Sequence, residues 1–160
     1  MVSEHELSMS LPLDSDGFLR NECPTCEREF KSRPTPEGEE PTPAPAGGYF
    51  CPYCAVQAAP DAWLTKAQIE RATAIAYNEV VAPELEEFKR SVEGINQSGG
   101  GLLGIRAEVS MEGPDAPPEL EEPDDMRRVD FPCHPAEPAK VLDDWDREVH
   151  CLICGKAVAS

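Results

Sequence analysis

The chain has few of the large apolar side chains from which a protein core is built. Leu, Ile, Val and Phe together number 31 among 160 residues, while Pro alone numbers 17, and 31 acidic against 14 basic side chains give a net charge of −17. A chain with so little apolar surface and so much charge of one sign cannot offset its conformational entropy by burial alone. This composition excludes a single large core and the broad buried sheets of a Rossmann domain or a β/α barrel.

Long hydrophobic runs are also missing. No apolar stretch approaches the roughly 18 residues that span a bilayer, so we expect no membrane segment. Residues 1–10 are acidic and lack the basic and apolar regions of a secretion signal. They predict a disordered tail on a cytoplasmic protein. Because cytosolic thiols stay reduced, clustered cysteines there are typical of metal ligands or redox centres rather than structural disulfides.

Seven cysteines are nevertheless present, and six of them form Cys-x-x-Cys pairs. The first two pairs are Cys23/Cys26 and Cys51/Cys54, each with a proline after its first cysteine. A tight turn within each pair aims both sulfurs at one point, and the proline fixes φ where that turn begins. Four thiolates in two such pairs are typical of a tetrahedral structural zinc site. We expect zinc here, with iron and dithiol redox chemistry as the alternatives.

The other three cysteines lie near the C-terminus, as the pair Cys151/Cys154 and the single Cys133. A closed zinc site needs a fourth ligand, and either His134 or His150 can supply it. We favour His134, because two ligands then come from each arm of the site. The chain is therefore expected to bind two zinc ions. A nucleophilic Cys133 activated by a neighbouring histidine is the catalytic alternative, but nothing nearby supplies an orienting third group, so we expect no catalytic residues.

Residues 18–54 resemble a zinc ribbon, the small β module of many transcription factors and RNA polymerase subunits. We call each Cys-x-x-Cys turn a knuckle, and the two Cys-Pro-x-Cys knuckles are similar to those of rubredoxin as well. The resemblance implies that the four cysteines of the first two pairs are the metal ligands. Glu27 and Ala55 stand where a glycine usually follows each knuckle.

Composition divides the rest of the chain into segments. Residues 11–60 are expected to form the first zinc ribbon, with a solvated proline-rich loop at 32–48. A helical segment (61–93) and an acidic, Gly/Pro-rich linker (94–125) separate it from a second ribbon-like module (126–160). The expected fold class is a small, metal-stabilised α+β protein in which two zinc-ribbon-like β modules are joined by a helix and an acidic flexible linker.

The helical segment carries its own start and break signals. Thr65 followed by Gln68 fits a capping box, with Asp61 as a competing start. Apolar residues then recur at spacings of three and four as far as Val92, and we expect them to pack against the zinc module. Pro83 removes a hydrogen-bond donor and clashes with the preceding turn, so we expect it to break or kink the helix.

Two shorter patterns belong to other segments. Residues 102–111 alternate between apolar and other side chains, a period typical of a strand, and whether this strand docks on a module is left open. Asp14-Ser15-Asp16-Gly17 has residue types found in calcium loops but not the spacing of an EF-hand, so it predicts a turn.

The charge distribution bears directly on function. Every segment has a net negative charge, which argues against nucleic acid, because phosphates are bound largely by Lys and Arg. A closed zinc site has no open position for water, which argues against an enzyme. We therefore expect an adaptor that binds another protein, with zinc fixing its shape. The alternative is a nucleic-acid- or transcription-associated protein, suggested by the zinc-ribbon resemblance alone, and a cysteine-based redox or hydrolytic enzyme comes third.

Overall fold

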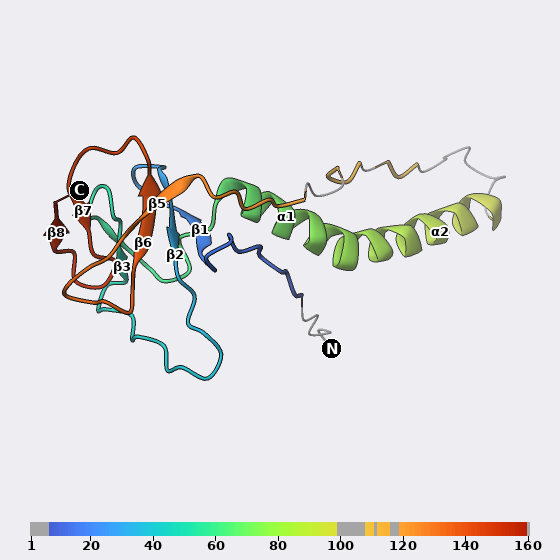
Figure 1. Cartoon of the computed structure of the whole chain (residues 1–160). Helices are drawn as coiled ribbons and strands as arrows, with labels where there is room; N and C mark the ends of the chain where they lie inside the picture. The colour runs from blue at the N-terminus through green and yellow to red at the C-terminus, as the bar shows by residue number, and fades with distance from the viewer. Residues whose placement is uncertain (1–6, 99–107, 111, 116–118, 160) are drawn as a thin grey trace. The chain divides into compact units, whose positions relative to one another are not determined.

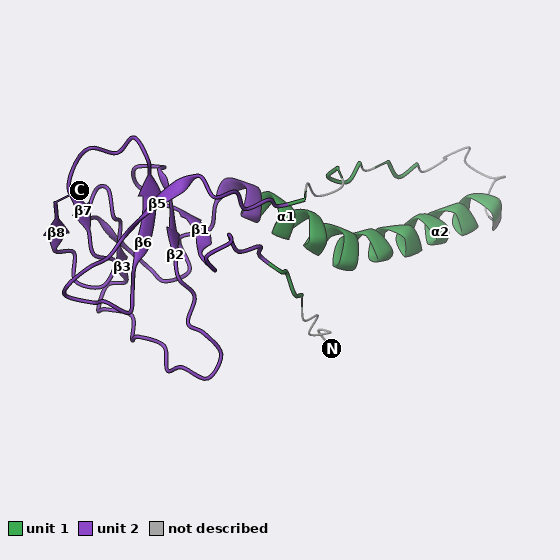
Figure 2. Cartoon of the chain, in the orientation of Figure 1, with its two compact units in different colours: residues 1–10, 69–119 green, residues 11–68, 120–160 purple. Residues whose placement is uncertain are grey.

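The computed structural model of this α+β chain describes residues 7–98, 108–110, 112–115 and 119–159. The chain divides into a cysteine-bearing unit, residues 11–68 and 120–160, and a helical unit, residues 1–10 and 69–119 (Figure 2). The elements are β1 (Leu19–Glu22), β2 (Glu29–Ser32), β3 (Tyr49–Phe50), β4 (Gln57–Ala58), α1 (Lys66–Ala76), η1 (Tyr77–Val81), α2 (Ala82–Ser98), β5 (Met126–Val129), β6 (Ala139–Leu142), β7 (Val149–His150) and β8 (Ala157–Val158) (Figure 1).

Strands from both ends of the chain form one antiparallel sheet in the order β1-β2-β6-β5. Its central pairing joins β2 to β6, with Lys31 opposite Lys140 and Ser32 opposite Ala139. We expected two separate β modules, and the structure differs. The physical reason is that a two-stranded hairpin by itself is only marginally stable. The β1/β2 hairpin leaves one edge of β2 unpaired and the β5/β6 hairpin leaves one edge of β6 unpaired, and pairing β2 with β6 satisfies the backbone groups of both edges.

The core of the cysteine-bearing unit is also shared between the two halves of the sequence. Phe30 and Trp63 come from the first half and are 3% and 6% exposed, and their rings meet edge to face with centroids 5.6 Å apart. Phe131, Val141 and Val149 come from the second half and are almost completely buried in the same cluster. Neither half therefore has a core of its own.

Two short hairpins, β3/β4 and β7/β8, each carry one knuckle and have the same register. Their knuckles are joined by a reciprocal pair of backbone hydrogen bonds. The N–H of Phe50 donates to the carbonyl oxygen of Leu152, and the N–H of His150 donates to that of Pro52, both at 2.9 Å. Each bond runs from the residue before one knuckle to the second residue of the other.

The helix begins at the predicted capping box. The N–H of Thr65 donates to Oε1 of Gln68 at 3.0 Å, and the N–H of Gln68 donates to Oγ1 of Thr65 at 3.1 Å. Gln68 also donates from Nε2 to the carbonyl oxygen of Arg20 in β1, at 2.9 Å. The first turn is thereby fixed to the sheet, and Asp61 is not the start.

Pro83 does not end the helix. Helical conformation continues through η1, a π-helical segment that ends two residues before the proline, and on to Ser98 in α2. The N–H of Ala82 donates to the carbonyl oxygen of Tyr77, five residues earlier. A π turn widens the backbone where the proline ring would meet the preceding turn, so the irregularity falls ahead of Pro83.

The apolar stripe of the helix is less buried than expected. Ile69 is 50% exposed, Phe88 55% and Ile95 69%, whereas Ala74 is 3% exposed. Other large side chains of the stripe, among them Leu85 and Val92, are half-buried. The stripe is therefore only partly covered.

Parts of the expected tail, linker and loop have different outcomes. The tail prediction falls partly on residues 1–6, and the strand prediction mostly on 102–107 and 111, which lie outside the described residues.

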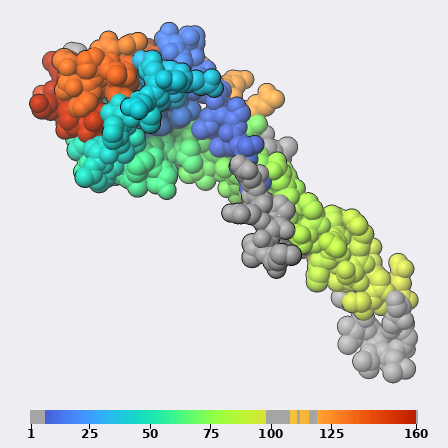
Figure 3. All heavy atoms as spheres, turned by 90° about the horizontal axis from the view of Figure 1, so that it is seen from below, coloured from blue at the N-terminus to red at the C-terminus, as the bar shows by residue number. Residues whose placement is uncertain are grey.

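The end of the expected linker belongs to the cysteine-bearing unit, where Glu122 binds Arg20 and Lys31. The proline-rich loop lies on the surface of that unit, as the cyan segment of Figure 3 shows.

Candidate metal centres

The first cluster is formed by Cys23 and Cys26, between β1 and β2, and by Cys51 and Cys54, between β3 and β4. The Sγ atoms of Cys23 and Cys54 are 3.8 Å apart, and those of Cys26 and Cys51 are 3.7 Å apart. All four sulfurs lie within 4.8 Å of one another. The thiols are free, since a disulfide would bring two sulfurs to about 2.05 Å.

Both knuckles of this cluster turn their backbone N–H groups toward sulfur. The N–H groups of Thr25 and Cys26 each donate to Sγ of Cys23 at 3.4 Å, and that of Tyr53 donates to Sγ of Cys51 at the same distance. Such hydrogen bonds favour the charged thiolate. The spacing of a Cys-x-x-Cys turn thus supplies both ligands and part of their stabilisation.

The residue after each knuckle takes a left-handed backbone conformation, whether or not it is glycine. Glu27 has φ 57°, Ala55 has φ 59° and Gly155 has φ 71°. In each knuckle this residue donates its N–H to the carbonyl oxygen of the first cysteine, at 2.9 to 3.0 Å. The turn therefore has one geometry in all three knuckles, and the two non-glycine residues adopt it with backbone strain.

The second cluster contains Cys133, His134, Cys151 and Cys154. The Sγ atoms of Cys133 and Cys154 are 3.4 Å apart, and Sγ of Cys151 lies 3.5 Å from Nδ1 of His134. One arm is the knuckle between β7 and β8, and the other is the loop between β5 and β6. The structure thus brings His134 to the cysteines through its Nδ1 atom.

His150, the alternative ligand, lies in a different environment. Its Nδ1 atom is 3.2 Å from the carbonyl oxygen of Pro52, which also accepts the backbone N–H of His150. It therefore contacts the neighbouring knuckle instead of the cluster that contains His134.

Burial makes an uncompensated thiolate costly in both clusters. Burial raises the pKa of Cys51 far above its usual range, and it raises the pKa of Cys151 to about 11. The pKa of the more open Cys154 is lowered, chiefly by the backbone N–H of Lys156. A thiolate at the buried Cys51 or Cys151 needs a nearby cation, and a bound metal ion supplies one.

The observed spacings fit a tetrahedral ion. Four sulfurs at about 2.3 Å from one ion lie about 3.8 Å from one another, and an imidazole nitrogen at about 2.05 Å lies about 3.6 Å from each sulfur. The distances of 3.7 and 3.8 Å in the first cluster, and of 3.5 Å between sulfur and nitrogen in the second, agree with these values, while the 3.4 Å between the sulfurs of Cys133 and Cys154 is shorter. Both clusters can therefore hold a metal ion with four protein ligands.

Tyr53, in the knuckle between Cys51 and Cys54, connects the first cluster to the other half of the sequence, a role that the sequence did not indicate. Its hydroxyl donates to the carbonyl oxygen of Glu29 at 2.7 Å and accepts the N–H of Leu142 at 3.0 Å. Burial raises the pKa of Tyr53 to about 12. The neutral hydroxyl therefore bridges the start of β2 and the end of β6.

A buried group of charges lies in the same unit and was also not indicated by the sequence. Oδ2 of Asp14 accepts Nζ of Lys140 at 2.7 Å and Nζ of Lys31 at 3.2 Å, and Lys31 reaches Oε1 of Glu122 at 2.8 Å. Oδ1 of Asp14 accepts the N–H groups of Asp16 and Phe18, which forms the predicted turn. Asp14, Asp16 and Asp124 also lie close together, but two ammonium groups already neutralise Asp14.

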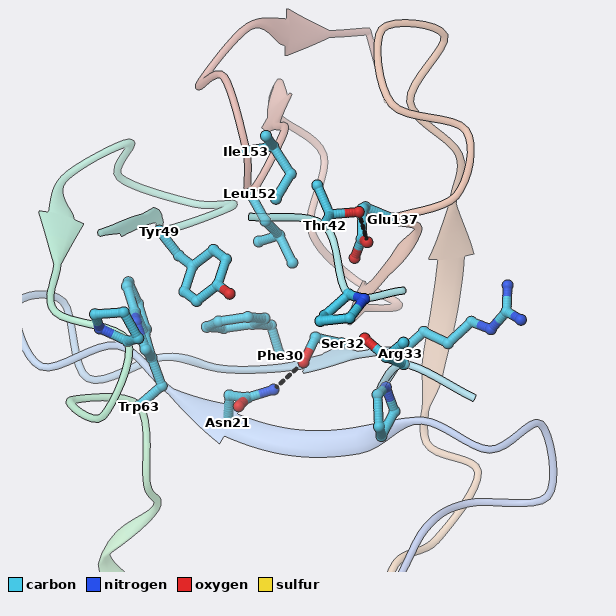
Figure 4. Close-up of a pocket in the computed structure, with 14 residues that line it drawn as sticks. Asn21, Phe30, Ser32, Arg33, Thr42, Tyr49, Trp63, Glu137, Leu152 and Ile153 are labelled. Atoms are coloured by element: carbon cyan, nitrogen blue, oxygen red, sulfur yellow. Dashed lines mark hydrogen bonds between the residues drawn. The ribbon is translucent and has the colours of Figure 1, made fainter. Parts of the chain in front are cut away.

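A cavity of about 240 Å³ lies in this unit and has walls from both halves of the sequence (Figure 4). Phe30, Tyr49 and Trp63 line it from the first half, and Leu152 and Ile153 from the second knuckle-bearing hairpin. Thr42 in the proline-rich loop donates a hydrogen bond to Glu137 at its rim. The loop is thereby attached to the second half.

Comparisons of the chain with protein-family models, with curated proteins and with solved structures gave no match. None of the helices in the described part of the chain has the length and apolar character needed to cross a membrane.

Proposed function

We propose that this chain is a structural zinc protein that holds two zinc ions and serves as a binding module for another protein. The observation that carries the first part is the spacing of the two four-atom clusters, which fits a tetrahedral ion in each. Four-cysteine and three-cysteine, one-histidine sets are ligand sets typical of structural zinc. Cys23, Cys26, Cys51 and Cys54 would hold one ion, and Cys133, His134, Cys151 and Cys154 the other.

A structural role is favoured over a catalytic one by the ligand count. Catalytic zinc keeps one position open for water or substrate, and four protein ligands leave none. The clusters also lie between the hairpins that make up the fold, so the bound ions would join segments far apart in the sequence. The zinc ions would therefore fix the shape of a surface and carry out no chemistry.

Two observations support a protein partner. Large apolar side chains recur at every seventh residue of the helix and are exposed to solvent. They are Val81 (42% exposed), Phe88 (55%) and Ile95 (69%), and they form an apolar row. Such rows are typical of surfaces that bind another protein. The net charge of −17 opposes binding to nucleic acid and favours a partner with basic groups around an apolar site.

Elemental analysis of the purified chain tests the zinc sites. We expect two zinc ions per chain, one per chain in the Cys23→Ser variant and one in the Cys154→Ser variant, provided each variant stays folded. Iron with a visible absorption band, or no metal in protein purified without chelators, would overturn the assignment.

The partner role needs a separate experiment, because it depends on the helix as well as on the metal. Proteins retained by the immobilised chain should be lost when Phe88 and Ile95 are both replaced by Ser. A matched variant with Glu87→Ser and Glu93→Ser, on the same helix, should keep them. Equal retention by both variants would show that the apolar row is not the binding surface.

A further inference from the structure

The two clusters differ in how well their sulfurs are protected from solvent. In the first cluster, Cys23 and Cys51 are 1% and 0% exposed, and the other two cysteines are half-buried. In the second cluster only Cys151 is buried, and Cys133 is exposed. Exposure is one of the two conditions for cysteine oxidation, the other being thiolate character, which a bound cation provides in both clusters.

The local sequence explains why Cys133 is the least protected ligand. In the knuckles, the N–H two residues after the first cysteine donates to its sulfur, as Thr25 does to Cys23 and Tyr53 to Cys51. The residue two positions after Cys133 is Pro135, which has no N–H. The sulfur of Cys133 therefore lacks the donor that the knuckles provide at this position. Because a bound cation already keeps this sulfur as a thiolate, a donated N–H would only lower its nucleophilicity, so the missing donor leaves Cys133 more reactive.

A second thiol lies within reach of Cys133. Sγ of Cys154, from the opposite arm of the cluster, is 3.4 Å away, closer than the 3.7 and 3.8 Å between sulfurs of the first cluster. A disulfide between them requires the sulfurs to approach to about 2.05 Å. One arm is a turn-rich loop in which Pro132 and Pro135, on either side of Cys133, are exposed, while Pro138, directly before β6, is buried. The exposed part of the loop can therefore move without disturbing the central sheet.

We propose that Cys133 is a site of oxidation by hydroperoxides, with Cys154 as the resolving thiol, and that this oxidation releases the metal ion of the second cluster while the first cluster keeps its own. The proposal rests on the proposed function, because it requires both clusters to hold zinc.

The chemistry balances with hydrogen peroxide as the oxidant. The thiolate of Cys133 attacks one peroxide oxygen, the O–O bond breaks, and hydroxide leaves, which gives a sulfenic acid. The thiolate of Cys154 then attacks that sulfur and expels a second hydroxide as the S–S bond forms. The two sulfurs supply the two electrons that reduce peroxide. The ion keeps only Cys151 and His134 as protein ligands and is no longer held by a closed set.

The test follows zinc and disulfides together in the full-length, zinc-loaded chain. Hydrogen peroxide is added in the presence of a chromogenic zinc chelator, and the products are digested and mapped by mass spectrometry. We expect one of the two zinc ions to be released, with a Cys133–Cys154 disulfide and unmodified Cys23 and Cys51. Release of both ions together, oxidation of the first cluster first, or a different disulfide in the second cluster would overturn the proposal.

A matched pair of variants tests the cause without changing a ligand. Pro132 and Pro135 are both exposed and both occupy the second position of a turn, closed by His134 N–H to Phe131 and by Glu137 N–H to His134. Only Pro135→Ala restores an N–H two residues after Cys133. We expect slower zinc release in Pro135→Ala than in the wild type or in Pro132→Ala. Equal rates in the two variants would overturn the role of the missing donor.

The metal content measured before oxidation separates this inference from the proposed function. A chain purified with no zinc overturns both. A chain with two zinc ions that resist peroxide, while glutathione in the same solution is oxidised, overturns only the oxidation site.

Discussion

The backbone N–H of His150 donates to the carbonyl oxygen of Pro52 at 2.9 Å, which joins the two knuckle-bearing hairpins directly. The reverse bond, from Phe50 to Leu152, has the same length. Together with the pairing of β2 and β6, these bonds place both candidate metal centres in one folding unit. Loss of either ion should therefore affect the other half of the unit.

The first prediction concerns this coupling. Cys154→Ser should shift the amide signals of Phe50 and Lys31 as well as those of residues 139–158, because the two halves share a sheet and a core. Two-dimensional NMR of the zinc-loaded variant is the measurement, and Glu148→Gln, at an exposed position, is the control. Signals from Phe50 and Lys31 that stay at their wild-type positions would show that the halves fold independently.

The second prediction is that complete removal of metal unfolds the cysteine-bearing unit. Zinc binding contributes about 10–16 kcal/mol in zinc-finger peptides near neutral pH, which exceeds the few kcal/mol that a core this small supplies. We expect chelation to abolish the near-ultraviolet circular dichroism of Trp63 and Trp145, and readdition of zinc to restore it. Retention of that signal in metal-free protein would show that the core alone holds the fold.

The third prediction concerns the buried carboxylate of Asp14. Burial opposes its ionisation, but hydrogen bonds from Lys140, the N–H of Phe18 and Lys31 outweigh burial and lower its pKa from 3.8 to about 2. Its contribution to stability is thus complete above its ordinary pKa and lost only as the pH falls toward 2. Asp14→Asn removes a buried charge-assisted hydrogen-bond acceptor, while Lys31 keeps Glu122 and Lys140 keeps Asp16, and it should cost about 1.5–3 kcal/mol.

Urea unfolding measures this cost against a matched control. Asp16→Asn removes a carboxylate that is 63% exposed and also binds Lys140, and it should cost at most about 1 kcal/mol. The difference between wild type and Asp14→Asn should stay constant from about pH 8 to about pH 5. A difference that already shrinks over this range would contradict the lowered pKa.

The fourth prediction compares equivalent positions after two knuckles. Gly155 has φ 71°, and a Cβ there would lie 2.9 Å from ring atoms of Phe50. Gly155→Ala should therefore destabilise the unit through strain and through this contact with the other hairpin. Ala55 already has φ 59°, so Ala55→Gly should be neutral or stabilising by up to about 1 kcal/mol. Thermal unfolding of the zinc-loaded variants checks both signs.

The fifth prediction separates the two classes of partner. The chain should not retard duplex DNA in a native gel at about physiological salt, because no segment supplies a net positive field. Lys140, one of few basic residues in the C-terminal segment, is 3% exposed and paired with Asp14 and Asp16. A retarded band that disappears steeply as salt rises would favour the nucleic-acid alternative.

The sequence by itself determined the features that depend on neighbouring residues. Cys-x-x-Cys spacing indicated which sulfurs gather, because a four-residue turn fixes their relative positions wherever it lies. The capping box at Thr65 and the turn at Asp14 followed in the same way, from hydrogen bonds within a few residues. The preference for His134 over His150 also came from the sequence, but only as a choice between two histidines, each of which adjoins a different cysteine.

Tertiary structure alone decided how these local pieces combine. The pairing of β2 with β6, the bonds between the knuckles and the bridge from Tyr53 join segments that are far apart in the chain. The sequence does not show which open strand edge meets which, because backbone N–H and C=O groups are the same at every edge. Nor does it show that Lys31 and Lys140 are buried, since an ammonium group is buried only where carboxylates from other segments meet it.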